Sequence, residues 1–260
     1  MFSLDHRGGH NRYQFNKDFF KTWTPEMAYV LGFMYADGNI MDSVISRTQY
    51  VSFDSADKEI IEKIKIALSS NHKIQIKPER IAVHLNGAYK SREAFRLRIG
   101  SREMFADLLK LGLTPRKSLI TEFPHDIPVD CLSHFVRGYF DGDGCVHIMK
   151  GKGKYGQEIS RGLAVIFTSG SKVFLEGLRN KFESMGFRSG KMYFGSRAYR
   201  LKYSTSESMR WFQVFYGNQL GDTLFLKRKR DNFIKYFQNR NRKIDNNILE
   251  TLKMYGPVLK

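Results

Sequence analysis

Apolar and polar residues follow one another along this chain with two different periods, which predict helices and strands respectively. In DKEIIEKIKIAL (residues 57–68), apolar residues stand three or four positions apart, the spacing of one face of a helix. In FRLRI (residues 95–99), apolar and basic residues alternate one by one, as in a strand with one buried face. The mixture of helices and strands predicts an α+β fold.

The predicted elements occur in the same order twice. In the first set, helices are expected at residues 24–37, 57–68 and 102–113, with strands near residues 40, 50–53, 72–77, 81–85 and 95–99. In the second set, helices are expected at residues 130–143, 172–186 and 207–217, with strands near residues 146, 163–167, 192 and 199–203. The chain is therefore predicted to consist of two similar halves.

Direct sequence repeats support this division. YVLGFMYADGNI (29–40) aligns with VRGYFDGDGCV (136–146) at an offset of 106 residues, which places Asp37 on Asp143. PRKSL (115–119) aligns with LKRKR (226–230), which places Lys117 on Lys229 or on Lys227. We expect an N-terminal arm, a first half, a linker with two prolines, a second half and a C-terminal tail, at residues 1–23, 24–120, 121–129, 130–238 and 239–260.

Small residues stand four positions apart in both repeated helices, at Gly32 and Ala36 and at Gly138 and Gly142. Residues four apart share one helix face, so these two helices can pack unusually closely about a pseudo-two-fold axis. Parallel packing would bring Asp37 and Asp143 together at one end, where two carboxylates repel unless a cation lies between them.

The local sequence excludes one common cation site. An EF-hand loop with Gly144 at its sixth position would place Tyr139 first and Lys150 twelfth, where acidic ligands are required. The aspartates instead follow helix C-termini, whose partial negative charge disfavours an acid unless something cationic lies beside it. We therefore expect Mg²⁺, with Mn²⁺ or Ca²⁺ able to occupy the same place, held by Asp37, Asp143 and the carbonyl oxygens of Ala36 and Gly142.

Charge identifies the class of partner. The chain has 43 Lys+Arg against 26 Asp+Glu, a net charge of +17 and a pI near 9.8, which indicates a polyanion. The basic residues stand among aromatic ones in strand-like segments, and no basic amphipathic helix dominates, which favours nucleic acid over a membrane surface. No apolar run approaches a membrane span, and the N-terminus resembles no signal peptide. We expect a soluble intracellular protein, in a bacterial cytoplasm or an organelle, with Cys131 and Cys145 as packing residues.

Paired acids beside a basic surface predict metal-dependent phosphodiester hydrolysis. Lys117, Lys227 and Lys229 are candidates to stabilise developing charge, or to contact phosphates. A two-stranded ribbon fits the major groove of DNA, so the outward residues of the predicted strands and the basic loop at 150–157 are candidates for DNA contact. These candidates are Arg47, Lys73, Gln75, Lys77, Arg96, Arg98, Lys150, Lys152, Lys154, Arg197, Arg200 and Lys202.

Two stretches, VLGFMYADG (30–38) and VRGYFDGDG (136–144), resemble the paired signature motifs of the LAGLIDADG homing endonucleases. TPRKSL (114–119) and LKRKRDNF (226–233) are similar to later elements of that family. The resemblance spans residues 24–237 and implies two αββαββα halves, saddle-shaped antiparallel sheets for DNA, and a Mg²⁺-dependent double-strand cut.

The resemblance also assigns residues. It carries Asp37 and Asp143 over as metal-binding catalytic acids. Tyr35 departs from the pattern where the signature has an earlier aspartate, which the second stretch has as Asp141. Asp54 and Thr168 stand where family members often place a polar residue that positions water.

Two motifs in one chain imply a monomer that binds a long, asymmetric double-stranded DNA target, as expected for intron homing. Two alternatives remain open at this level. The same fold resembles intron maturases, whose partner is intron RNA, and it also resembles regulators that bind DNA without cutting it. Retention of both Asp37 and Asp143 favours cleavage.

Overall fold

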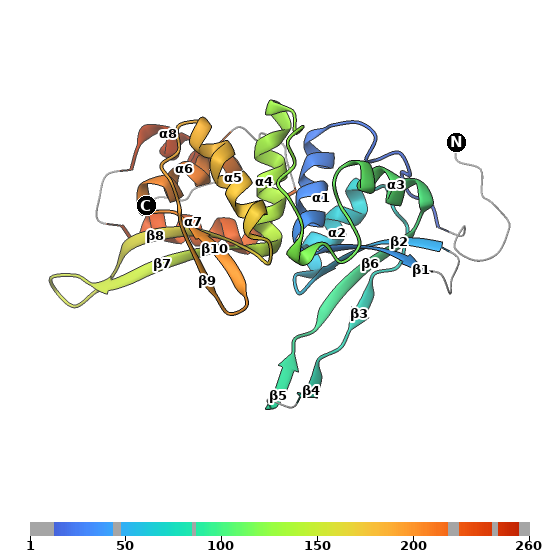
Figure 1. Ribbon diagram of the computed structural model, residues 1–260. Helices are drawn as coiled ribbons and strands as arrows, with labels where there is room; N and C mark the ends of the chain where they lie inside the picture. The colour runs from blue at the N-terminus through green and yellow to red at the C-terminus, as the bar shows by residue number, and fades with distance from the viewer. Residues whose placement is uncertain (1–12, 44–47, 85–86, 218–223, 241–243, 255–260) are drawn as a thin grey trace.

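The computed structural model describes residues 13–43, 48–84, 87–217, 224–240 and 244–254 of the 260-residue chain. Its helices lie together on one side of two four-stranded antiparallel sheets, and the opposite side of these sheets carries no described helix (Figure 1). Two helices, α1 and α4, stand side by side at the centre, one from each half of the chain.

The first half follows the predicted order, including the strand expected near 81–85, with one added strand. Its elements are α1 (Pro25–Ala36), β1 (Gly38–Ser43), β2 (Thr48–Ser55), α2 (Lys58–Ala67), β3 (Gln75–Lys77), β6 (Ala94–Gly100) and α3 (Arg102–Lys110). A hairpin formed by β4 (Arg80–His84) and β5 (Gly87–Ser91) is inserted between β3 and β6 and projects beyond the sheet (Figure 1). A short 3-10 turn, η2 (Lys117–Leu119), ends this half.

The second half repeats the order without the insertion. Its elements are α4 (Val129–Asp143), β7 (Gly144–Lys152), β8 (Glu158–Ser169), α5 (Lys172–Ser184), β9 (Lys191–Gly195), β10 (Ala198–Lys202) and α6 (Thr205–Tyr216). Helices α7 (Lys227–Gln238) and α8 (Asn246–Met254) follow. The four-stranded sheets have equivalent orders, β1-β2-β6-β3 and β7-β8-β10-β9. The predicted fold of two pseudo-symmetric αββαββα halves is confirmed.

Local sequence explains how these elements form. Thr24 caps α1 by accepting a hydrogen bond from the backbone N–H of Met27 (3.1 Å), and Pro25 occupies the first helical position. On α2, Ile60, Ile61 and Ile64 are fully buried. The core is thus built from the predicted apolar face of each outer helix packed on its sheet.

The two central helices pack through their small residues. A Cβ on Gly32 would lie 1.9 Å from the carbonyl oxygen of Phe135, and a Cβ on Gly138 would lie 2.0 Å from that of Tyr29. Both contacts relate residues by the same 106-residue offset, as a pseudo-two-fold axis requires. Only glycine allows the two backbones to approach so closely, and the predicted close packing of these helices is confirmed.

Several local predictions were wrong or incomplete. The strand expected at 72–77 is confined to β3, which begins at Gln75, and Ile76 is 61% exposed because β3 is an edge strand. Strand β5 and helix α7 were not predicted. Cys145 is exposed on β7 and is not a packing residue, whereas Cys131 is buried.

None of the helices within the described ranges is long and apolar enough to cross a membrane.

Candidate active site at the ends of the motif helices

Asp37 and Asp143 lie next to each other at the C-terminal ends of α1 and α4. Asp37 is the C-cap of α1, and its backbone N–H donates to the carbonyl oxygen of Phe33 (2.9 Å). Asp143 is the last residue of α4. A Cβ on Gly142 would lie 2.4 Å from the Cβ of Ala36 and 3.4 Å from Oδ2 of Asp37, so the two helix ends touch at this point.

A buried lysine closes the end of each motif helix. Lys117 Nζ donates to the carbonyl oxygens of Tyr35 and Ala36, both at 3.0 Å. Lys229 Nζ donates to the carbonyl oxygens of Phe140, Asp141 and Gly142, at 2.5, 2.8 and 3.3 Å. The Phe140 carbonyl oxygen also accepts from the backbone N–H of Gly144, the C-cap of α4. Each ammonium thus bonds carbonyls at the end of its motif helix and offsets the negative end of the helix dipole.

The structure distinguishes between the two lysine candidates of the second half. Lys229 is 3% exposed and contacts the end of α4, whereas Lys227 is exposed at the first residue of α7. The two residues stand two positions apart on one helix and therefore face different directions. Lys229 is the counterpart of Lys117, and Lys227 does not share its contacts.

The electrostatics of the pair fit a cation. Asp37 reaches solvent along one side, yet desolvation at the crowded helix ends and the charge of Asp143 raise its pKa to about 6. Burial also raises the pKa of Asp143, against the lowering effect of Lys117 and Lys229. Two carboxylates that resist ionisation together are stabilised by a divalent cation between them.

The lysines respond in the opposite sense. Burial lowers the pKa of Lys229 to about 8, an effect that the nearby charge of Asp141 partly offsets. Burial lowers the pKa of Lys117 as well, although Asp143 and Asp37 favour its charged form. Burial therefore disfavours the charged forms of both lysines, as it does those of both aspartates.

The donor set matches magnesium better than zinc. Within the described residues, no group of three or more His, Cys, Asp or Glu side chains is placed to hold a metal. Two carboxylates, with water and phosphate completing the shell, is the composition Mg²⁺ prefers. The carbonyl oxygens of Ala36 and Gly142 already accept from Lys117 and Lys229, so any contact with a metal would have to use their second lone pairs.

Sequence reasoning gave no role to a buried group next to this site. Asp141 is 2% exposed, and its Oδ2 accepts hydrogen bonds from Tyr29 Oη (2.7 Å) and from the backbone N–H of Leu226 (2.8 Å). The signature resemblance marked position 141 as an acid but offered no partner for it. Its partners lie 112 and 85 residues away along the chain.

The first sheet presents a paired set of charges on the face away from the helices. Arg96 donates through Nε to both carboxylate oxygens of Asp54, at 2.8 and 3.1 Å, and Lys77 also bonds Asp54. Arg98 stacks on the ring of Tyr50, with its guanidinium carbon 3.6 Å from the centroid. Leu97 and Ile99 between them are fully buried, so the predicted alternation on β6 is confirmed. Asp54 and Tyr50 thus hold Arg96 and Arg98 in place on this face.

The other candidates for DNA contact in the first half do not all lie on strands of the sheet. Gln75 is on β3 opposite Arg96, while Lys73 precedes the strand and is exposed. Arg47 lies outside the described residues.

The second sheet carries its cations differently. Arg200 and Lys202 are on β10 opposite Thr168 and Ile166 of β8, so no acid faces them there. Arg197 is exposed in the two-residue turn between β9 and β10, with a positive φ of 63°.

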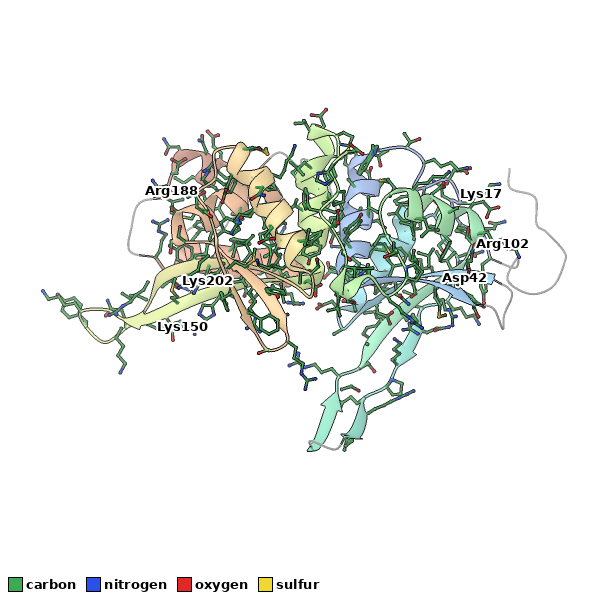
Figure 2. All side chains as sticks on the ribbon, in the orientation of Figure 1. Lys17, Asp42, Arg102, Lys150, Arg188 and Lys202 are labelled. Carbon is green, nitrogen blue, oxygen red and sulfur yellow. The ribbon has the colours of Figure 1, made fainter. Side chains whose placement is uncertain are left out.

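The long β7–β8 hairpin also carries basic residues away from the core. Lys150 and Lys152 are on β7, Lys154 is in the turn, and Lys150 pairs with Glu158 (2.9 Å). Figure 2 shows Lys150 and Lys202 on the sheet of this half, and Arg102 and Arg188 among the helices. Positive charge is therefore not confined to the sheets.

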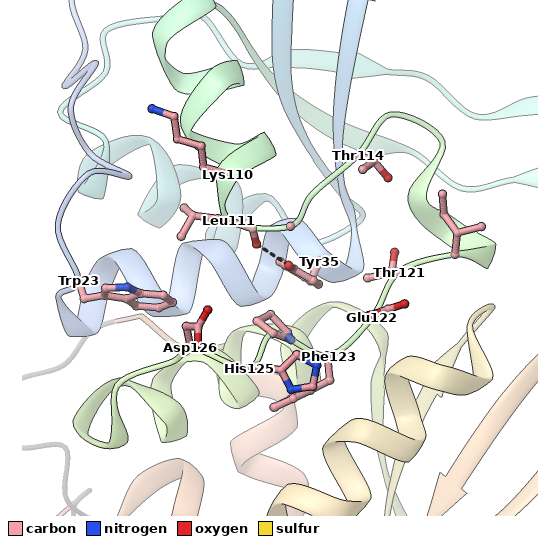
Figure 3. Close-up of a pocket in the computed structure, with 13 residues that line it drawn as sticks. Trp23, Tyr35, Lys110, Leu111, Thr114, Thr121, Glu122, Phe123, His125 and Asp126 are labelled. Carbon is pink, nitrogen blue, oxygen red and sulfur yellow. Dashed lines mark hydrogen bonds between the residues drawn. The ribbon is translucent and has the colours of Figure 1, made fainter.

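A pocket of about 390 Å³ lies between α1, the end of α3 and the segment that joins the halves (Figure 3). Tyr35 lines it and donates through Oη to the carbonyl oxygen of Leu111 (2.6 Å). Trp23 and His125 lie on other sides of the pocket, and neither Asp37 nor Asp143 lines it. It is separate from the paired aspartates.

The comparisons agree with this geometry. Residues 130–214 match the model of the LAGLIDADG-like domain family. The whole chain is similar in fold to the homing endonuclease I-WcaI bound to its DNA recognition sequence, with a TM-score of 0.56 and 17% identity over 83% of this chain and 90% of that one. The chain has the LAGLIDADG homing endonuclease fold.

A second solved structure has a similar fold across both halves. The I-LtrWI LAGLIDADG homing endonuclease bound to target DNA has a TM-score of 0.50 at 12% identity, and covers 92% of this chain and 97% of its own. No curated protein sequence matches this chain. At these identities the structural neighbours establish the fold alone.

Proposed function

We propose that this LAGLIDADG protein is a site-specific endonuclease that makes a double-strand cut in DNA and requires a divalent metal. The observation that carries the proposal is the meeting of Asp37 and Asp143 at the common end of two tightly packed helices, each end closed by a buried lysine. The comparable proteins I-WcaI and I-LtrWI are described as bound to DNA, which supports DNA as the substrate.

Each residue of the site has a proposed part. Asp37 and Asp143 would hold Mg²⁺ with the help of the Ala36 and Gly142 carbonyls, and Mn²⁺ or Ca²⁺ would occupy the same place. When bound, such a cation supplies an activated water and stabilises the leaving oxygen of an in-line displacement. Lys117 and Lys229 keep the helix ends in position and place positive charge beside the phosphate, where negative charge develops.

The remainder of the protein would bind the target. Each half offers one sheet face free of helices, and two halves in one chain suit a monomer on a long, asymmetric DNA site. On the first sheet, Arg96 and Arg98 are fixed by Asp54 and Tyr50 and suit base reading, since a held guanidinium loses less entropy on binding. Lys150, Lys152 and Lys154 on the hairpin suit contacts with phosphates.

The test uses a plasmid that carries the joined sequences flanking the gene. The purified protein is incubated with it in Mg²⁺ or in EDTA, and linear product is followed on a gel. We expect linear product in Mg²⁺ only, and its loss in Asp143→Asn with DNA binding retained. Asp130→Asn, an exposed acid in the first turn of the same helix, is the matched control and should cut normally. A cutting Asp143→Asn variant would refute the site.

The same experiment separates the alternatives. Tight, salt-sensitive DNA binding without cutting in any metal would favour a DNA-binding regulator. If the protein instead binds the intron RNA more tightly than the joined DNA, the maturase function would replace the endonuclease. The basic sheets suit either partner, and the paired aspartates favour cutting.

A further inference from the structure

Asp141 is buried in the second motif helix and takes no part in the proposed metal site. Its Oδ2 accepts from Tyr29 Oη of the first half and from the N–H of Leu226, while its Oδ1 has no hydrogen-bond partner among the described residues. A buried carboxylate is costly, so its retention at this position calls for a role.

The contact with Leu226 lies at the start of α7. Leu226 is the N-cap residue of that helix, and its own side chain cannot accept a hydrogen bond. In a capping box, an acid of the same helix accepts from the N-cap N–H. Here Asp141 does so from a different helix, and it thereby ties the first turn of α7 to α4.

The first turn of α7 carries Lys229 as its third residue. Lys229 reaches the Gly142 carbonyl only while that turn stays against the end of α4. A second contact with the first half fastens the same turn, because Arg228 donates to both carboxylate oxygens of Asp57, at 2.8–2.9 Å. The turn that carries Lys229 is therefore fastened to the first half at two points. Asp141 links it to Tyr29, and Arg228 links it to Asp57.

The first half holds its own lysine in another way. The counterpart of Asp141 there is Tyr35, which donates to Leu111 and not to the turn that carries Lys117. That turn closes on itself, since Thr121 donates to the carbonyl oxygen of Lys117 through Oγ1 (2.6 Å) and through its N–H (3.0 Å). The turn that carries Lys117 also packs against Gly170 of the second half, but its hydrogen bonds come from neighbouring residues. The hydrogen bonds that fasten the turn of Lys229 come from distant residues.

We propose that Asp141 is a positioning residue that fixes Lys229 through the first turn of α7, so that the second half's site depends on the first half. The catalytic part of this inference rests on the proposed nuclease function. The placement of Lys229 does not, because it can be measured without any cutting.

The first test is acetylation of the full-length protein by limiting acetic anhydride, with each lysine followed by mass spectrometry. In Asp141→Ala, we expect Lys229 to be acetylated roughly tenfold faster than in the wild type as the turn loosens, with Lys117 in the same sample unchanged. Asp141→Asn should stay protected, since its amide oxygen can accept both hydrogen bonds and its nitrogen replaces the partnerless Oδ1. Equal protection of Lys229 in the folded Ala variant and the wild type would overturn the proposal.

Should Asp141→Ala fail to fold, Arg228→Ala tests the same fastening at a surface position. It should expose Lys229 in the same direction by a smaller factor, and Glu62→Gln, which removes an exposed ion pair on α2, should not. If Arg228→Ala leaves Lys229 as protected as Glu62→Gln does, the inference also fails.

The second test follows each labelled strand of the cleavable DNA separately. Asp141→Ala should slow the cut of one strand roughly tenfold more than the cut of the other. The reason is that a displaced Lys229 would slow the cut of the strand at which it acts. Asp141→Asn should restore the wild-type ratio. A wild-type protein that cuts nothing would refute the nuclease function alone, whereas equal slowing of both strands in a cutting, folded Asp141→Ala would refute the positioning role.

Discussion

The two halves of the molecule have the same backbone plan but differ in the polar contacts around it. Gly32 and Gly138 make equivalent contacts, and Asp37 and Asp143 end equivalent helices. By contrast, Tyr35 corresponds to Asp141, and the two side chains have unrelated partners. The two halves are alike where they pack against each other and where each contributes an aspartate to one shared site.

The second half also has a buried cation without a counterpart. Arg137 is fully buried and donates to the carbonyl oxygens of Leu224 (3.0 Å) and Phe215 (2.8 Å), whereas Leu31 stands at the equivalent position of α1. Together with Asp141 it fixes the segment that leads into α7. The second half therefore uses long-range polar contacts where the first half uses a short local turn.

The largest expected effect comes from removing either buried lysine. Lys117→Met and Lys229→Met should each lower the rate of cutting by roughly 10²–10³, as loss of one group that stabilises developing charge does. Each should slow a different strand, which strand-specific labelling would detect. Lys227→Met is the matched control for Lys229 and should change cutting far less. Equal slowing of both strands in both variants would mean that the lysines do not divide between the halves.

The next effect concerns the packing that the halves share. Alanine normally stabilises a helix relative to glycine, by about 1 kcal/mol. In Gly32→Ala and Gly138→Ala the sign should reverse, with a loss of about 3 kcal/mol, because the new Cβ meets a main-chain carbonyl at 1.9 or 2.0 Å. Urea unfolding of both variants measures this loss. A stability equal to that of the wild type in either variant would contradict the close packing.

A smaller effect should distinguish the two sheet faces that we propose bind DNA. Asp54 bonds Arg96 and Lys77 on the first sheet, while Thr168 faces Arg200 at the equivalent place on the second. Asp54→Thr should strengthen non-specific DNA binding several-fold and steepen its salt dependence by about one unit of log K per log salt, since a carboxylate no longer competes with phosphate. Thr168→Asp should do the reverse. Titrations of both variants at several salt concentrations decide whether the difference is electrostatic.

The smallest effect concerns stability and pH. The pKa of Asp37 is about 6 in the folded protein against an ordinary value of 3.8, so its charged form is disfavoured by folding. The resulting loss of stability is complete above pH 6 and disappears as the pH falls toward 4. In EDTA at pH 7.5, Asp37→Asn should therefore raise Tm by about 2–4 °C, a part of the shift being screened by solvent.

The same measurement in metal provides the control. Mg²⁺ should raise the Tm of the wild type and leave that of Asp37→Asn nearly unchanged, because a ligand stabilises only the form that binds it. If Asp37→Asn lowers Tm in EDTA at pH 7.5, the carboxylate would be stabilising without a metal, and the two aspartates would not repel.

The sequence by itself determined the shared features. The 106-residue repeat gave the two halves, the helical and strand periods gave their elements, and the spacing of Gly32, Ala36, Gly138 and Gly142 indicated which helix faces meet. These features depend on regular spacing along one segment, and such spacing can be read from the chain. The meeting of Asp37 and Asp143 followed from them directly.

Only the tertiary structure decided which polar groups surround that meeting point. It showed that Lys229, and not Lys227, contacts the end of α4, and it gave Asp141 and Arg228 their partners. These contacts join residues 85 to 171 positions apart. Such contacts depend on how distant segments pack against each other in the folded protein, and the spacing of residues along one segment does not predict this. The β4–β5 insertion interrupted the repeat for the same reason, because a hairpin beyond the core is free of the pattern that burial imposes.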